Sequence, residues 1–313
     1  MKVSVVGLGR VGATLAYTLV LKGVVDQLVL VNRNHDKAEG DALDLQHAHL
    51  FVDKQIDICA GETEDTAGSD VIALCASAPW KDNFTDRNQS AIANTRLFEQ
   101  IVPELAAASP DAKILVLSNP VDVLTWHVLR LSGFPPERVM GTGTLVDSAR
   151  FREALSDEIG IHPSDIRAYV LGEHGDSQFL AYSCAEAGGE PVDDLPERRE
   201  MFRRTTQAGY EVFNKKGYTN YAIAMAGSYV IEAIASDTRH TMPLSVLIDG
   251  DEKTGGYAGV SGVCLSVPVV VGREGIIRWM RPELTDEESQ AFSLSADVIR
   301  QTIVATLADE ERQ

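Results

Sequence analysis

Apolar residues in the first half of the chain fall into short runs that alternate with stretches of helical periodicity. The short runs are rich in Val, Ile and Leu and predict buried strands at residues 2–6, 27–31, 70–75 and 112–117. The stretches with helical periodicity predict helices at residues 13–22, 91–108 and 123–131. Alternating strands and helices are typical of a parallel sheet covered by helices. The pattern therefore predicts an α/β fold with a Rossmann-type, doubly wound parallel sheet.

A glycine-rich turn directly follows the first predicted strand. It reads Gly-Leu-Gly-Arg-Val-Gly over residues 7–12 and leads into the first predicted helix, an order that is typical of dinucleotide-binding proteins. The first glycine makes the tight turn, the second lets the backbone approach a pyrophosphate, and the third lets helix and strand pack closely. The helix N-terminus adds N–H groups for the phosphates. We therefore predict a dinucleotide site that includes Gly7, Gly9, Arg10, Val11 and Gly12.

The residues after the second predicted strand leave open which dinucleotide binds. NAD enzymes usually have an acidic side chain here, which accepts hydrogen bonds from the ribose hydroxyls. This chain has Asn32 followed by Arg33. Asparagine does not repel a 2′-phosphate and Arg33 could pair with one; equally, Asn32 could bind an unphosphorylated ribose while Arg33 stays solvated. NAD is the expected cofactor, and NADP is the alternative.

The second half contains residues that suit acid–base chemistry. A helix is predicted to open at Asp147, which lies three positions before Arg150 and therefore on the same face. His174 follows a predicted strand at 167–171 and stands between two glycines and two carboxylates. A helix followed by an antiparallel strand can bring Asp147 beside His174, where a carboxylate would fix the imidazole tautomer and raise its pKa. The same residues also suit a surface helix and an ordinary turn.

The pattern changes near residues 141–146, which predicts a division into two domains. An amphipathic pattern from residue 285 onward, with acids at its start, predicts a terminal helix that packs on the core. We expect a Rossmann-type dinucleotide-binding domain over residues 1–143 and an α+β catalytic and substrate domain over residues 144–313.

Composition narrows the class of protein. With 44% hydrophobic residues and no apolar window long enough to span a membrane, the chain is expected to be a globular, cytoplasmic protein. A strand that begins at Lys2 leaves no room for a signal peptide before it. The formal charge of −18 argues against binding to nucleic acid or to anionic membranes. The scattered cysteines predict reduced, buried side chains and no metal cluster; they are Cys59, Cys75, Cys184 and Cys264.

Further segments give a resemblance that covers essentially the full length. Besides residues 7–12, 147–150 and 171–176, the matching segments are Asn119-Pro120-Val121-Asp122, Gly141-Thr142-Gly143-Thr144, Lys216-Gly217-Tyr218-Thr219 and Ser266-Val267-Pro268. In this order they resemble the L-lactate/malate dehydrogenase family, and most of all its bacterial-type L-lactate dehydrogenases. The resemblance implies reversible hydride transfer between a nicotinamide cofactor and a small 2-oxo acid.

The resemblance implies a role for each matching residue. His174 would donate a proton to the 2-oxo oxygen, Asp147 would stabilise its imidazolium, and Arg150 would grip the substrate carboxylate. Asn119 would bond the substrate oxygen near the nicotinamide. Arg87, on a mobile loop, would polarise the substrate carbonyl when the loop closes and expels water. The same resemblance places four residues at the cofactor: Ala76, Asn94, Ser118 and Asn119.

The loop before Arg87 is expected to select the substrate, and it can be aligned in two ways. One alignment puts Lys81 at the selecting position, where it would favour the second carboxylate of oxaloacetate. The other puts Trp80 there, which would favour pyruvate or a larger 2-oxo acid. Glu173 and Thr219 match the lactate-type pattern. Pyruvate is therefore the expected substrate, and malate dehydrogenase and L-2-hydroxyisocaproate-type dehydrogenase are the alternatives.

The resemblance also bears on regulation and assembly. Arg152 matches an arginine with which bacterial lactate dehydrogenases bind fructose 1,6-bisphosphate, and Arg167 stands where a histidine is usual. The two arginines could hold a phosphate or simply balance an acidic chain. A homotetramer is the expected assembly, with a dimer as the alternative. Two rival classes are an NAD-dependent glycosidase, which needs a cysteine-bound metal near the histidine, and a non-catalytic sensor, which would lack His174, Asp147 or Arg150.

Overall fold

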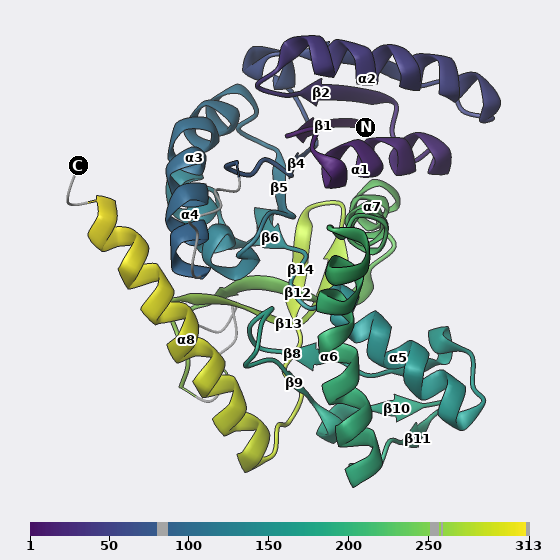
Figure 1. Ribbon diagram of the computed structural model, residues 1–313, viewed down its shortest axis with the longest axis vertical. Helices are drawn as coiled ribbons and strands as arrows, with labels where there is room; N and C mark the ends of the chain where they lie inside the picture. The colour runs from purple at the N-terminus through teal and green to yellow at the C-terminus, as the bar shows by residue number, and fades with distance from the viewer. Residues whose placement is uncertain (80–86, 251–256, 258, 311–313) are drawn as a thin grey trace.

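A nine-stranded sheet runs through the computed structural model, and helices lie on both of its sides (Figure 1). The structure describes residues 1–79, 87–250, 257 and 259–310. The strand order is β14-β13-β12-β6-β5-β4-β1-β2-β3. The strands are β1 (Lys2–Val6), β2 (Gln27–Val31), β3 (Asp57–Gly61), β4 (Val71–Leu74), β5 (Lys113–Val116), β6 (Val139–Gly141), β12 (His240–Ile248), β13 (Val263–Gly272) and β14 (Gly275–Trp279).

The first six strands pair in parallel, in the order β3-β2-β1-β4-β5-β6. This is the Rossmann order, so the predicted α/β class is confirmed. The helices are α1 (Arg10–Lys22), α2 (His35–Ala48), α3 (Arg87–Ala108), α4 (Val121–Ser132), α5 (Leu145–Ile159), α6 (Pro196–Lys216), α7 (Tyr221–Ser236) and α8 (Asp286–Glu310). Short 3-10 helices occupy His49–Phe51, Thr63–Thr66, Pro136–Arg138, Pro163–Asp165 and Tyr182–Cys184. In open sheets of this type, ligands bind at the carboxyl ends of the strands where the strand order reverses, beside β1 and β4.

The second half of the chain continues the same sheet with antiparallel strands. β12 pairs with β6 and with β13, and β13 pairs with β14. Two small sheets lie beside it: one contains β7 (Ile166–Arg167), β10 (Glu186–Ala187) and β11 (Glu190–Pro191), and the other contains β8 (Val170–Leu171) and β9 (Phe179–Leu180).

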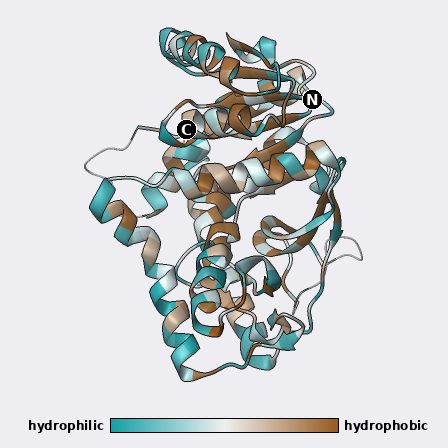
Figure 2. Cartoon of the chain, turned by 90° about the vertical axis from the view of Figure 1, so that its right-hand side faces the viewer, coloured by the Kyte–Doolittle hydropathy of each residue, from teal (hydrophilic) through white to brown (hydrophobic). Residues whose placement is uncertain are grey.

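The core forms on both faces of the parallel strands. All four residues of β4 are buried, as are four of the five in β1 and in β2, which is what strands covered on both faces require. Figure 2 shows hydrophobic colour on strands and helices of the interior, whereas hydrophilic colour lies mostly on outer helical turns. Within the described part of the chain, none of the helices combines the length and the apolar character that a membrane span requires.

Some local expectations were wrong. α1 begins at Arg10 and α3 begins at Arg87, each several residues earlier than expected, because the first turn of each helix contains few apolar residues. The single strand expected at 167–171 is two strands, β7 and β8, which belong to different sheets. Cys59 is exposed rather than buried, because it occupies an exposed position of the edge strand β3. Cys75 and Cys184 are partly exposed.

Candidate active site

The glycine-rich turn connects β1 to α1 at the carboxyl edge of the sheet. Gly7 has a φ of +96°, and a Cβ there would lie 2.4 Å from the Ala76 Cα. A Cβ on Gly12 would lie 2.0 Å from the Gly7 carbonyl oxygen. Gly9 differs, because no atom of the described residues lies within 4 Å of its Cβ position. The backbone at Gly9 therefore faces open space, which leaves room for a pyrophosphate at the start of α1.

Arg10 brings positive charge to this end of α1. Its guanidinium carbon lies 3.8 Å from the centroid of the Tyr218 ring, and Val11 beside it is partly buried. The first turn of α1 contains no acidic residue. A cation at a helix N-terminus is unfavourable unless an anion accompanies it. The residues present therefore fit a dinucleotide whose phosphates lie on this turn.

Asn32 follows β2 and braces the glycine-rich turn. Its Oδ1 accepts a hydrogen bond from the Leu8 N–H at 3.1 Å, and its Nδ2 donates to the Asn34 carbonyl at 3.1 Å. Arg33 is exposed. The position at which an acidic side chain usually binds the ribose therefore carries a neutral amide that is engaged with the protein backbone.

Asn94 connects the ends of β4 and β5. It is 2% exposed, its Oδ1 accepts from the Ala78 N–H at 2.7 Å, and its Nδ2 donates to the Asn119 carbonyl at 2.7 Å. The Ser118 hydroxyl donates to the Ala76 carbonyl at 2.6 Å. The structure thus brings together all four residues that were expected at the cofactor, and of these Asn119 is exposed.

Asp147 and His174 form a hydrogen-bonded pair. Asp147 lies in the first turn of α5 and His174 follows β8, and the distance between His174 Nδ1 and Asp147 Oδ2 is 2.7 Å. The Asp147 side chain is 4% exposed, whereas that of His174 is 31% exposed. Since Nδ1 is held by the buried carboxylate, Nε2 is the ring nitrogen left for a ligand.

The electrostatics favour a charged pair. Burial opposes the imidazolium, yet the hydrogen bond and charge of Asp147, with the charge of Asp122, raise the pKa of His174 above its ordinary value. Burial likewise opposes the ionised form of Asp147, but the bond with His174 and the charges of His174 and Arg150 hold its pKa below the usual range. The pair therefore favours the protonated imidazole more strongly than an isolated histidine would.

Arg150 contacts the second oxygen of the same carboxylate. Its Nη1 lies 3.0 Å from Asp147 Oδ1 and its side chain is 22% exposed. It also packs against α6, where a Cβ on Gly209 would lie 3.4 Å from Nη1. Asp147 thus orients both an imidazole and a guanidinium, whose remaining N–H groups can bind an anion with a forked geometry.

The structure describes only some of the residues that were expected to contact the substrate from loops. Trp80 and Lys81 lie outside the described residues. Arg87 is the first residue of α3, and its side chain also lies outside the description. Thr219 is exposed between α6 and α7. The roles expected for these four residues stay predictions.

Asp122 is a site residue to which the sequence analysis gave no role. It is the second residue of α4, it is 2% exposed, and its Oδ2 accepts a hydrogen bond from the His174 backbone N–H at 2.7 Å. The available signal was a carboxylate three positions after Asn119, at the carboxyl end of a predicted strand.

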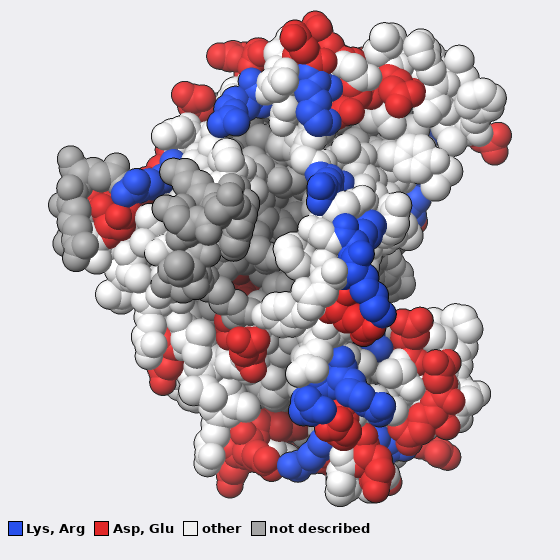
Figure 3. Space-filling model, in the orientation of Figure 1, with Lys and Arg blue, Asp and Glu red and all other residues white. Residues whose placement is uncertain are grey.

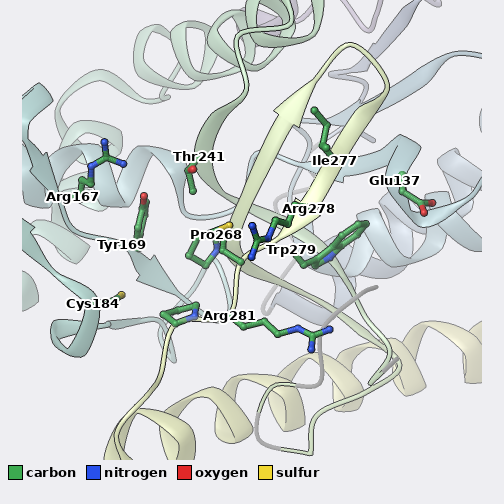
Figure 4. A pocket seen from close by; sticks show the side chains of 12 residues that line it. Glu137, Arg167, Tyr169, Cys184, Thr241, Pro268, Ile277, Arg278, Trp279 and Arg281 are labelled. Atoms are coloured by element: carbon green, nitrogen blue, oxygen red, sulfur yellow. The ribbon is translucent and has the colours of Figure 1, made fainter. Parts of the chain in front are cut away.

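The two arginines expected at an effector site both act electrostatically on Tyr169. Burial raises the pKa of Tyr169, and the charges of Arg167 and Arg152 oppose this effect. Arg152 Nε is buried without a hydrogen-bond partner in the described part of the chain, whereas Arg167 is exposed and its Nε lies 3.3 Å from Glu186 Oε1. Arg167 and Tyr169 line a cavity of about 860 Å³ that also contains Trp279 (Figure 4).

A parallel dinucleotide-binding sheet beside an Asp–His–Arg cluster defines an oxidoreductase with an NAD-type cofactor. Two family models match the chain, and together they cover nearly all of it. Residues 1–141 match the lactate/malate dehydrogenase NAD-binding domain, and residues 144–310 match the lactate/malate dehydrogenase alpha/beta C-terminal domain. The chain belongs to the lactate/malate dehydrogenase family.

Individual relatives make the class more specific. The chain is 41% identical to an L-lactate dehydrogenase of Thermoanaerobacter sp. (strain X514), over 96% of this chain and 98% of that protein. It is 38% identical to an L-lactate dehydrogenase of Clostridium botulinum (strain Langeland), over 96% of each. A solved lactate dehydrogenase from a Medee basin deep-sea metagenome library superposes with a TM-score of 0.91 at 31% identity, covering 97% of this chain and 98% of that one. These relatives identify a 2-hydroxy acid dehydrogenase and favour the lactate interpretation over malate.

Proposed function

We propose that the chain reduces pyruvate reversibly to L-lactate with NADH. The observation that carries the proposal is the His174–Asp147–Arg150 cluster, in which one buried carboxylate orients a proton donor and an anion-binding guanidinium. The names of the relatives, all L-lactate or lactate dehydrogenases, support pyruvate as the substrate.

The cluster supplies the proton chemistry. When bound, the nicotinamide supplies a hydride to the carbonyl carbon of the substrate. His174 donates its Nε2 proton to the carbonyl oxygen, which becomes the hydroxyl group, and the ring is left neutral. Asp147 keeps its hydrogen bond to Nδ1 throughout and stabilises the charged ring before the transfer. In the reverse direction, neutral His174 accepts the hydroxyl proton.

Other residues hold the substrate. Arg150 binds its carboxylate through the N–H groups that Asp147 does not use, Asn119 hydrogen-bonds the reacting oxygen, and Arg87 polarises the carbonyl. Thr219 forms part of the pocket wall, and either Trp80 or Lys81 contacts the substrate side chain. Residues 1–143 would hold the cofactor and contribute Asn119 and the Arg87 loop to the substrate site, and residues 144–313 would supply the catalytic cluster and the rest of the substrate pocket.

We further propose that NAD is preferred over NADP. The description of the matching N-terminal family model as an NAD-binding domain supports NAD. The neutral Asn32 and the exposed Arg33 leave binding of NADP as the alternative. Residues 7–12 would hold the phosphates of either cofactor, and Ala76, Asn94 and Ser118 would shape the nicotinamide side of the site.

Initial rates with pyruvate, oxaloacetate and 2-oxoisocaproate, each with NADH and with NADPH, test the proposal. Pyruvate with NADH is expected to give the highest kcat/KM and would make Trp80 the substrate-selecting residue. A preference for oxaloacetate would contradict the proposal and point to Lys81. A preference for 2-oxoisocaproate would assign a bulkier substrate, and activity with none of the pairs would favour a sensor.

Regulation, assembly and location follow as part of the same proposal. Arg152 Nε, which has no hydrogen-bond partner among the described residues, and Arg167, which like Arg152 acts on Tyr169, favour an anionic effector. Fructose 1,6-bisphosphate is expected to lower the KM for pyruvate in steady-state assays. We propose a homotetramer, with a dimer as the alternative, in the cytoplasm.

Acidic and basic side chains are interspersed on the face in Figure 3, and the net charge of −18 disfavours nucleic acid as a partner.

A further inference from the structure

A second buried carboxylate contacts the histidine of the proposed active site from the opposite half of the chain. Asp122 is 2% exposed, and its Oδ2 accepts from the His174 backbone N–H at 2.7 Å. Its Oδ1 is buried and forms no hydrogen bond of good geometry among the described residues, although the Ser245 hydroxyl is near enough to help lower the pKa of the carboxyl. A buried carboxylate with one hydrogen bond destabilises a fold compared with a neutral side chain of the same size. Packing alone therefore gives no reason for an acid at this position.

The connection spans the two halves of the site. Asp122 belongs to the β5–α4 segment that also carries Asn119, whereas His174 follows β8 and lies 52 positions further along the chain. On its other side the His174 loop is fixed by Gly172, whose N–H and carbonyl bond the Ser266 carbonyl and N–H at 3.0 and 2.9 Å. The Asp122 bond thus sets the position of His174 relative to Asn119.

The charge of Asp122 also acts on the imidazole. Burial raises the pKa of Asp122 to about 6, and the Ser245 hydroxyl, the His174 N–H and the His174 charge act against this increase. The carboxylate in turn favours the protonated form of His174. The start of α4 adds a favourable helix dipole for the anion. The other charged or titratable groups around the pair are Asp147 and Arg150 on α5, Glu173 in the same loop and Cys264 on β13.

We propose that Asp122 is a positioning residue, which fixes the His174 loop against the Asn119 segment and places a second carboxylate beside the proposed proton donor. The proposal rests on the proposed role of His174 as the proton donor. It gives His174 two carboxylates with different tasks, because Asp147 orients the ring through Nδ1 and Asp122 holds its backbone.

The first test is Asp122→Asn, because its amide oxygen can still accept from the His174 N–H while the charge is removed. We expect kcat for pyruvate reduction to fall about tenfold, and the pH profile of kcat/KM to move about 0.5 pH unit to the acidic side. The Kd for NADH is expected to stay unchanged. The exposed Asp165→Asn serves as a matched control. A pH profile that coincides with that of the wild type would overturn the role of the charge.

A second measurement is independent of catalysis. NMR titration of the His174 imidazole, assigned with His174→Asn, is expected to show a lower pKa in Asp122→Asn than in the wild type. By linkage, the Asp122 carboxyl should titrate at higher pH in His174→Asn than in the wild type, even if Asp122→Asn does not fold. Unchanged titration of both groups would overturn the proposal. A wild-type protein that reduces no 2-oxo acid, yet shows this coupling, would overturn the proposed function alone.

Discussion

Of the two carboxylates that raise the pKa of His174, Asp147 contributes more than Asp122. Asp147 raises the pKa of His174, so Asp147→Asn is expected to lower it. Pyruvate reduction needs the imidazolium and should then decline at lower pH than in the wild type. At neutral pH, kcat should fall about a hundredfold. Rates measured from pH 5.5 to 8.5 check this, and Asp157→Asn on the exposed face of α5 should behave as the wild type. A decline at the wild-type pH would show that Asp147 does not set the charge of His174.

The residue scale also shows how far a sequence can predict a site. Asp147 and Arg150 share a helix face by their spacing alone, and a strand after that helix can bring His174 back to it. Asp122 could not be assigned in this way, because its partner is a backbone N–H from a segment 52 residues away. An acidic residue at the start of a helix is favourable because of the helix dipole alone. Its presence in the sequence therefore does not indicate a tertiary contact. The long-range side-chain bonds of Asn32 and Asn94 were not predictable either, because they are made with backbone groups of segments 16 to 25 residues away.

At the scale of elements, two glycines of one turn are expected to respond differently to the same substitution. Gly9→Ala adds a methyl group to open space, so the melting temperature should stay close to that of the wild type while the Kd for NADH rises about tenfold. Gly12→Ala places a Cβ 2.0 Å from the Gly7 carbonyl oxygen and should lower the free energy of unfolding by about 2 kcal/mol. Circular dichroism melts and NADH fluorescence titrations separate the two effects. Wild-type NADH affinity in Gly9→Ala would mean that no phosphate approaches there.

The end of α8 is expected to make stability depend on pH. Arg130 Nη2 on α4 lies 2.6 Å from Glu310 Oε1 on α8 and 3.8 Å from Glu99 Oε1 on α3. Burial, with a further contribution from Glu310, raises the pKa of Glu99 from 4.5 to about 7. Between these values the folded state binds more protons than the unfolded state, so stability falls as pH rises through this window.

Glu99→Gln should remove that loss. Urea unfolding is expected to show a free energy of unfolding about 1–3 kcal/mol above the wild type at pH 8 and little difference near pH 4.5. Glu104→Gln, exposed on the same helix, is the control. An equal difference at both pH values would indicate a packing effect rather than a titrating carboxyl group.

Strands and helices could be predicted where their own residues, rather than their pairing partners, determine the structure. The inner parallel strands β1, β2, β4 and β5 are largely buried, so their apolar runs identify them without knowledge of their partners. The break between β7 and β8 was not predictable, because the two strands pair with β10 and β9 in different sheets. Apolar character at 166–171 is the same whether one strand or two are formed, and only the pairing decides between them.

The whole molecule leaves an apolar surface exposed across two adjacent helices. On α7, Tyr221, Met225 and Tyr229 are spaced four residues apart and therefore lie along one face, and Tyr221 is 68% exposed. On α1, which packs against α7, Tyr17 and Leu21 are more than half exposed as well. Several exposed large apolar side chains on two helices that pack together are typical of an interface.

We therefore expect a second copy of the chain to cover this surface. In a two-fold interface the same residues of both copies face each other. Light scattering coupled to size-exclusion chromatography should give a mass four times that of one chain, or twice in the dimer alternative. Met225→Glu introduces charges that the interface would have to bury unpaired, so it should yield a smaller species. Leu294→Glu, at an exposed apolar position on α8, should leave the mass unchanged. A wild-type monomer, or loss of assembly in Leu294→Glu but not in Met225→Glu, would show that α1 and α7 are not the contact.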